Sequence, residues 1–130
     1  MTQILQPPSL ELDKVLYAKR EMWVITKIER RIIWNLLNQL RDKGFGRFMV
    51  YDGEEETQCG ADIKAVMELV FNLDDAHVYL EGPSGKRVWI YLVFGNDGSD
   101  VISDYGYHPN EDFDGWNQFM DKDFDPEIYV

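Results

Sequence analysis

The 130-residue sequence predicts an α+β fold, with helices packed on one face of an antiparallel sheet of three to five strands. Two patterns carry this prediction. Apolar residues recur every three or four positions over residues 26–44, which is typical of an amphipathic helix. They alternate with polar residues over residues 76–81, which is typical of a strand. The turns at 82–85 and 95–98 are short, and short connections favour antiparallel pairing of consecutive strands.

The helix over residues 26–44 has recognisable start and stop signals. Thr26 and Glu29 have the T-x-x-E spacing of a capping box, in which each side chain binds a free amide of the first turn. Arg41 and Lys43 near the end of the helix are positively charged and complement the helix dipole. Gly44 can adopt the left-handed backbone conformation in which helices commonly end. Its apolar stripe consists of Ile28, Ile32, Ile33, Leu36, Leu37 and Leu40.

A hairpin and a second helix are expected next. Residues 47–51 are rich in strand formers, and Asp52 and Gly53 form a typical hairpin turn. The returning strand, residues 54–58, is nearly all polar, so we expect it at an edge of the sheet. Helical spacing returns over residues 62–72.

The second half of the chain predicts a three-stranded meander and a short final helix. In the strand at 76–81, the even-numbered residues face inward. The strand at 87–94 is apolar on both faces, which indicates an inner position in the sheet. A further strand starts at 101–102, and residues 113–120 have the spacing of a short helix. Three large aromatic side chains are expected in the core: Trp89, Tyr91 and Trp116.

We expect one α+β domain over residues 1–130, with loosely ordered ends at 1–25 and 121–130. No apolar run approaches the roughly 20 residues that a membrane helix needs. The single cysteine, Cys59, excludes an internal disulfide and suits a reducing compartment. A cytoplasmic protein without membrane contact is therefore predicted.

The charge is strongly acidic and uneven. The chain has 13 Lys and Arg against 24 Asp and Glu, a net charge of −11. Residues 96–130 hold one basic and ten acidic side chains, a net charge of −9. This surplus disfavours direct binding of a nucleic-acid backbone, which needs clustered basic residues. It favours a protein partner with a basic surface, whose approach it would steer.

The candidate partner-binding residues are of two kinds. The acidic candidates are Asp112, Asp114, Asp121, Asp123 and Asp125. The aromatic candidates are Trp34, which falls off the apolar stripe of its helix, and Trp23; exposed aromatic side chains often mark protein interfaces. Formation of a homo-oligomer stays open.

No catalytic residue, metal ligand or cofactor is assigned. The chain lacks the G-x-G-x-x-G, P-loop and G-x-S-x-G motifs of nucleotide-binding proteins and serine hydrolases. Enzyme activity stays open, and a non-enzymatic function is favoured. The alternative is a small hydrolase that depends on a divalent metal, since carboxylates and an imidazole lie close together in sequence at Asp97, Asp100, Asp104 and His108.

Two segments, VYDGEE (Val50–Glu55) and VFGNDGSDVISDY (Val93–Tyr105), carry a resemblance. Over residues 26–108 the chain resembles small bacteriophage, plasmid and related bacterial proteins that have no established activity. The resemblance implies a phage or mobile-element setting, where small acidic proteins often act by binding a host protein.

The leading functional hypothesis is therefore an acidic protein that inhibits a host nucleic-acid-binding protein, acting as a mimic of the phosphate backbone. A third possibility, beside the metal-dependent hydrolase, is an assembly component that dimerises through Trp34 and the N-terminal segment.

Overall fold

The computed structural model describes residues 4–8, 20–95, 98–108 and 114–130, with side chains in the first helix from residue 27 onward. Five antiparallel strands form one sheet in the order β2-β1-β3-β4-β5. The strands are β1 (Gly46–Tyr51), β2 (Glu56–Gly60), β3 (Asp75–Glu81), β4 (Arg87–Val93) and β5 (Ile102–Tyr107). The predicted α+β class is confirmed, and the polar strand β2 lies at an edge as expected.

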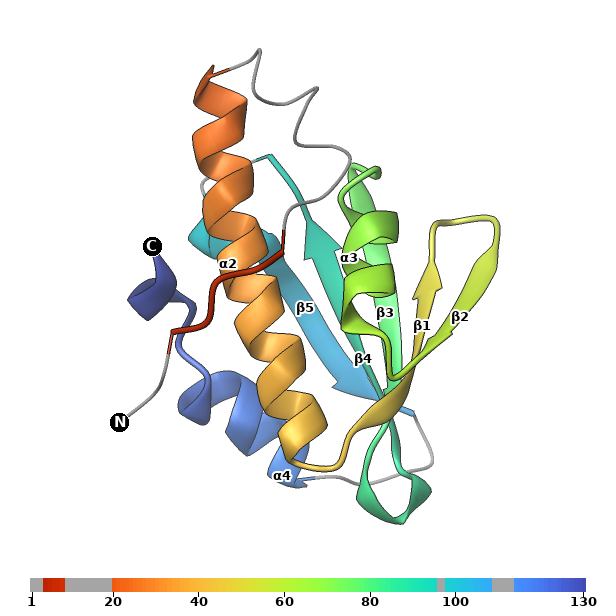
Figure 1. Ribbon diagram of the computed structural model, residues 1–130. Coiled ribbons are helices and arrows are strands. Elements are labelled where there is room, and N and C mark those ends of the chain that lie inside the picture. The colour runs from red at the N-terminus through yellow and green to blue at the C-terminus, as the bar shows by residue number, and fades with distance from the viewer. Residues whose placement is uncertain (1–3, 9–19, 96–97, 109–113) are drawn as a thin grey trace.

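The helices α2 (Arg20–Asp42) and α3 (Ile63–Val70) lie together on one face of the sheet (Figure 1). A short helix α4 (Asp114–Gln118) continues into a single π-helical turn, Phe119–Asp123. A 3-10 turn, Pro126–Tyr129, follows near the C-terminus. None of the helices in the described ranges is both long and apolar enough to span a membrane.

The predicted start of the first helix is wrong. The structure begins α2 at Arg20, so Thr26 lies inside the helix and cannot cap it. Glu29 is 1% exposed, and its Oε2 accepts a hydrogen bond of 2.8 Å from the backbone amide of Gly95. A tertiary contact with the loop after β4 thus replaces the local capping bond that the sequence spacing suggested.

The core fills the layer between the sheet and the helices. The predicted apolar stripe of α2 is buried, apart from the half-buried Ile28, and α3 adds four more side chains: Ile63, Val66, Met67 and Val70. In β3, the even-numbered residues Ala76, Val78 and Leu80 face inward as predicted. Trp116 is fully buried and is one of the largest core side chains, also as predicted.

Trp89 and Tyr91 are not core residues, and this prediction is wrong. In β4 the buried positions are Val88, Ile90 and Leu92, while the odd-numbered positions from 89 to 93 are half-buried on the opposite face. Successive side chains of a strand point to opposite faces. A run that is apolar at every position does not itself reveal which alternate set faces the helices.

Both described terminal segments are tied to α2. The side chain of Asn35 bonds the backbone of Leu5 twice, accepting from its amide at 2.7 Å and donating to its carbonyl at 3.0 Å. At the other end, Gln39 donates to the hydroxyl of Tyr129 at 2.8 Å. Phe124 and Tyr129 are 3% and 1% exposed, so the acidic C-terminal segment contributes to the core.

Candidate functional site

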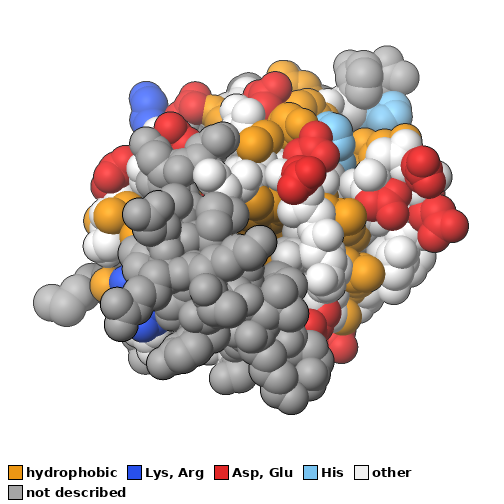
Figure 2. All heavy atoms as spheres, turned by 90° about the horizontal axis from the view of Figure 1, so that it is seen from above, with side chains coloured by type: hydrophobic (Ala, Val, Ile, Leu, Met, Phe, Trp, Pro, Cys, Tyr) orange, Lys and Arg blue, Asp and Glu red, His pale blue; other side chains and the backbone are white. Residues whose placement is uncertain are grey.

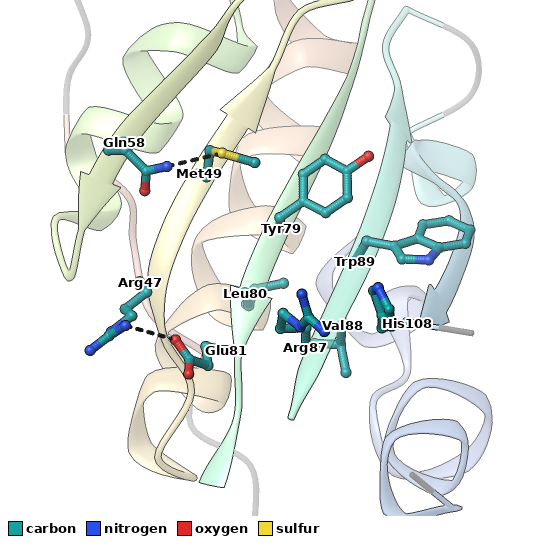
Figure 3. Close-up of a pocket in the computed structure, with 10 residues that line it drawn as sticks. All are labelled: Arg47, Met49, Gln58, Tyr79, Leu80, Glu81, Arg87, Val88, Trp89 and His108. Atoms are coloured by element: carbon teal, nitrogen blue, oxygen red, sulfur yellow. Dashed lines mark hydrogen bonds and ion pairs between the residues drawn. The ribbon is translucent and has the colours of Figure 1, made fainter. Parts of the chain in front are cut away.

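The face of the sheet that points away from α2 and α3 is the candidate site. Within the described ranges no helix or strand covers it, and Figure 3 looks onto it with the helices behind the sheet. We call this surface the open face. It consists of Arg47, Met49, Tyr51, Glu56, Gln58, Asp75, His77, Tyr79, Glu81, Arg87, Trp89, Tyr91, Asp104 and Gly106.

Strand register sets these side chains in rows across the sheet. Residues that are directly opposite in antiparallel strands project to the same face. The central row runs across all five strands through Gln58, Met49, Tyr79, Trp89 and Gly106. The next row runs through Glu56, Tyr51, His77, Tyr91 and Asp104.

His77 lies at the centre of a cluster of aromatic rings. Its ring stacks on Tyr91 with 4.5 Å between centroids and an interplanar angle of 26°. The rings of Tyr79 and Trp89 each lie 6.0 Å away, and that of Tyr51 lies 6.2 Å away. These spacings are those of favourable aromatic pairs. The cluster is therefore a packed platform of half-buried rings from three adjacent strands.

A hollow of about 590 Å³ opens on one end of this face (Figure 3). Met49, Tyr79 and Trp89 supply its apolar and aromatic lining, and Arg47, Glu81 and Arg87 bring charge to it. Such a volume lies within the range of ligand pockets, roughly 300–1,000 Å³. The hollow is part of the open face, so it suits a side chain of a partner as well as a small molecule.

The two ends of the open face carry opposite charge. At the end with the hollow, Arg47 pairs with Glu81 at 3.3 Å, and Arg87 lies opposite Glu81 in the register. We call Arg47 and Arg87 the cationic end. The anionic end consists of Glu56, Asp75 and Asp104.

The hydroxyl of Tyr91 donates a hydrogen bond to Asp75, which raises the pKa of Tyr91. Burial raises the pKa of Tyr79, and the neighbouring Tyr51 and Glu56 add to the effect. Both phenols therefore stay protonated near neutral pH.

Acidic and apolar side chains are neighbours on the molecular surface. Figure 2, which views the molecule from above Figure 1, shows red acidic side chains beside orange apolar patches and pale blue histidine.

Arg47 has an unusual backbone conformation. Between Gly46 and Met49 the register with β3 shifts by one residue, which makes a β-bulge. Arg47 sits in this bulge with φ of 51°, in the left-handed region that favours glycine. A strained residue of this kind beside a hollow is typical of positions kept for function.

The structure places three of the five predicted acidic residues away from the open face. Asp121, Asp123 and Asp125 are exposed in the C-terminal segment, which lies beside α2 (Figure 1). Two of them make local bonds: Asp123 accepts from Gln118 at 3.2 Å, and Asp125 accepts from the amide of Glu127 at 3.0 Å. Asp112 and the side chain of Asp114 lie outside the described residues.

The two predicted tryptophans both belong to α2 and not to the open face. Trp34 is half-buried and packs against the core. Trp23 lies in the same helix, but its side chain falls outside the described part of the structure. Trp34 thus has a packing role.

The residues of the alternative metal site are dispersed. Asp100 lies in a 3-10 turn, Ser99–Val101, Asp104 lies in β5, and His108 follows that strand; Asp97 lies outside the described residues. Over the ranges that the structure describes, no three His, Cys, Asp or Glu side chains are grouped so that they could hold a metal ion. Cys59 is half-buried, and its thiol pKa is raised by burial and by Asp62, which disfavours a reactive thiolate.

Sequence reasoning missed the open face as a site. The available signal was the outward set of 76–81, where His77 and Tyr79 are aromatic although an exposed strand face is normally polar. Comparison of the chain with protein-family models, curated proteins and solved structures found no match.

Proposed function

We propose that this protein acts by binding another protein and that the open face of the sheet is the contact surface. One observation carries the proposal: five stacked or tilted rings lie on a sheet face that no described helix or strand covers. The core on the opposite face already buries Trp116, Phe48 and the stripe of α2. The rings of the open face are therefore not required to complete the core.

The chemistry of the open face suits a protein interface. Interface centres are enriched in Tyr, Trp, Met and Arg. All four residue types occur around the hollow, as Tyr79, Trp89, Met49 and the two arginines of the cationic end. Since the rings already pack on one another, little side-chain freedom is lost on binding, which favours affinity.

The excess of acidic residues in this chain indicates the kind of partner that it attracts. A net charge of −11 steers a basic protein toward this one, and peripheral charges mainly raise the association rate. Given the resemblance to phage and plasmid proteins, the partner that we propose is a bacterial host protein with a basic surface, met in the cytoplasm. Inhibition of a nucleic-acid-binding protein is a second candidate function, in which Asp121, Asp123 and Asp125, on the helix side of the sheet, occupy its basic cleft.

Capture from a nuclease-treated bacterial lysate tests the surface. The full chain is compared with Tyr79→Ser/Trp89→Ser on the open face and with Asp121→Asn/Asp123→Asn/Asp125→Asn. The control is Ile128→Ser, which changes an apolar side chain that is 44% exposed in the C-terminal segment. Circular dichroism and the melting temperature establish that each variant is folded.

We expect a protein that the wild type and the Ile128 variant capture and the open-face variant loses. Loss with the aspartate variant as well, together with release by moderate salt, supports the nucleic-acid mimic. Capture that survives in the open-face variant and is lost only with the aspartates would overturn the assignment of the surface.

A further inference from the structure

The open face is complementary to itself. Its cationic end, Arg47 in β1 and Arg87 in β4, lies toward one end of the sheet along the strand direction, and its anionic end, Glu56 in β2, Asp75 in β3 and Asp104 in β5, lies toward the other. The row that contains Tyr79 and Trp89 lies between them. If a second copy is rotated by 180° so that its strands run in the opposite direction, the cationic end of each copy lies over the anionic end of the other.

We propose that a second copy of this chain covers the open face in a two-fold symmetric dimer. This inference rests on the proposed function, because it takes the same surface as a protein-binding face, which the second copy occupies when the host protein is absent. A two-fold axis in the plane of the interface and perpendicular to the strands reverses each strand against its copy. It keeps β1 over β1 and β4 over β4.

This symmetry brings opposite charges together twice. On the β1 side, Arg47 of one copy meets Glu56 of the other, because Glu56 lies opposite Tyr51 at the far end of β1. On the β4 side, Arg87 meets Asp104, which lies opposite Tyr91 at the far end of β4. Between these pairs, Tyr79 and Trp89 of one copy face the same two residues of the other, and Glu81 faces His77. An arginine that reaches the anionic end also lies over aromatic rings, where cation–π attraction adds to the ion pair.

The area of the sheet is sufficient for a weak dimer. Five strands about 4.8 Å apart, each of about six residues at roughly 3.3 Å per residue, give about 500 Å² of flat face per copy. Two such faces bury about 1,000 Å² in total, near the lower limit of a specific interface. We therefore expect association in the micromolar range of concentration, not a permanent dimer.

The net charge of −11 does not prevent this association. The exposed Asp121, Asp123 and Asp125 lie beside α2, on the side of the sheet that carries the helices. In a face-to-face dimer these segments are on the two outer sides, at least roughly 20 Å apart, which is about two Debye lengths at physiological salt. Their mutual repulsion is screened, while the charges at the interface are in contact.

Sedimentation equilibrium of the full chain, from about 1 to 500 µM, is the first test. The expected mass rises with concentration from the 15.3 kDa of one chain toward twice that value. A mass that stays at 15.3 kDa over the whole range overturns the dimer.

Charge exchange is the second test and identifies the surface. Arg47→Glu/Arg87→Glu makes both ends of the face acidic, and Glu56→Lys/Asp104→Lys makes both ends basic. Each variant alone is expected to self-associate at least about tenfold more weakly than the wild type. An equimolar mixture of the two is expected to associate again, because each acidic face then meets a basic one.

The matched control is Asp121→Lys/Asp123→Lys, which makes the same change of charge on the helix side. It is expected to dimerise like the wild type, so equal weakening by this control would overturn the assignment to the open face. Failure of the mixture to associate, with both variants folded, would do the same.

The experiments can disprove the dimer and the proposed function independently of each other. If the chain is monomeric and the Tyr79/Trp89 variant still loses a captured protein, the open face binds a different protein and the dimer is wrong. If the charge-reversal variants show that the chain dimerises through the open face, but no captured protein is lost when the open face is changed, the proposal that a host protein binds this surface is wrong.

Discussion

The indole of Trp89 occupies the space that a side chain at Gly106 would need. The two residues are paired in the register of β4 and β5. A Cβ atom added to Gly106 would lie 2.5 Å from Cζ2 and 2.7 Å from Cε2 of the indole, far inside contact distance. Because Gly106 has no side chain, the indole extends over β5 and widens the aromatic surface of the open face.

Gly106→Ala should displace this indole. Since the backbone of Gly106 does not have positive φ, alanine fits the strand and the clash is with the ring alone. We expect an altered near-ultraviolet circular dichroism spectrum and weaker self-association, by about threefold to tenfold, equivalent to roughly 0.7–1.4 kcal/mol. Sedimentation measures the latter.

Gly46→Ala is the control for this change. Gly46 is also in a strand, and no atom lies within 4 Å of an added Cβ. It should leave the spectrum and the association unchanged. A Gly106→Ala protein that behaves in the same way would contradict the role of the indole.

Arg47→Gly should stabilise the fold relative to Arg47→Ala. Both variants lose the ion pair with Glu81, which contributes little because the Arg47 side chain is 82% exposed. Only glycine relieves the positive φ of the bulge, and left-handed conformation costs about 1–2 kcal/mol in other residues. After the larger entropy loss of glycine, we expect a net difference of about 0.5–1 kcal/mol in urea unfolding.

Self-association gives this prediction a second readout. Both Arg47 variants should associate more weakly than the wild type, because the cationic end is diminished in each. A variant that is more stable to unfolding but self-associates more weakly would show that the strained conformation of Arg47 is kept for binding and not for stability. Equal stability of the glycine and alanine variants would show that the bulge is not strained.

Glu29 should make the protein less stable as the pH rises toward 7. Burial raises the pKa of Glu29 from 4.5 to about 7, although the amide of Gly95 opposes the shift. The folded state therefore holds the Glu29 proton more tightly than the unfolded state does. Stability from this residue is fully present below about pH 4.5 and is lost as the pH passes through 7, by up to about 3 kcal/mol.

Glu29→Gln removes this titration while its amide oxygen can still accept from Gly95. We expect the variant to be more stable than the wild type at pH 8, with a difference that shrinks as the pH falls to 5. Urea denaturation at several pH values measures this difference. A difference that does not vary with pH would mean that Glu29 ionises normally in the folded protein.

The C-terminal segment should be needed for folding through its aromatic residues and not through its charges. Phe124→Ala removes a side chain that is 3% exposed and should cost about 3–5 kcal/mol. Neutralising the exposed Asp121, Asp123 and Asp125 with Asn should change stability by less than about 1 kcal/mol, since Asn at 125 can still cap. Thermal and urea unfolding compare the two. A large loss with the Asn variant would show that the charges hold the segment in place.

Local patterns were enough to predict most elements. The three- and four-residue spacing of Ile32, Leu36 and Leu40 identified the main helix, and alternation in 76–81 identified β3 and its inward side. The Asp52–Gly53 turn and the polar edge strand were also confirmed. These features depend on residues close together in sequence, so the sequence alone is sufficient to predict them.

The candidate site could not be predicted in this way. The outward side of β4 is aromatic in Trp89 and Tyr91 while its inward side is aliphatic, so both sides resemble a core in sequence. Glu29 has the spacing of a cap, yet it binds Gly95, 66 residues away. Which face of the sheet the helices cover, and which contacts replace local ones, are decided by packing between distant segments. Only the tertiary structure could therefore show that the aromatic rings of β1, β3 and β4 form one open surface.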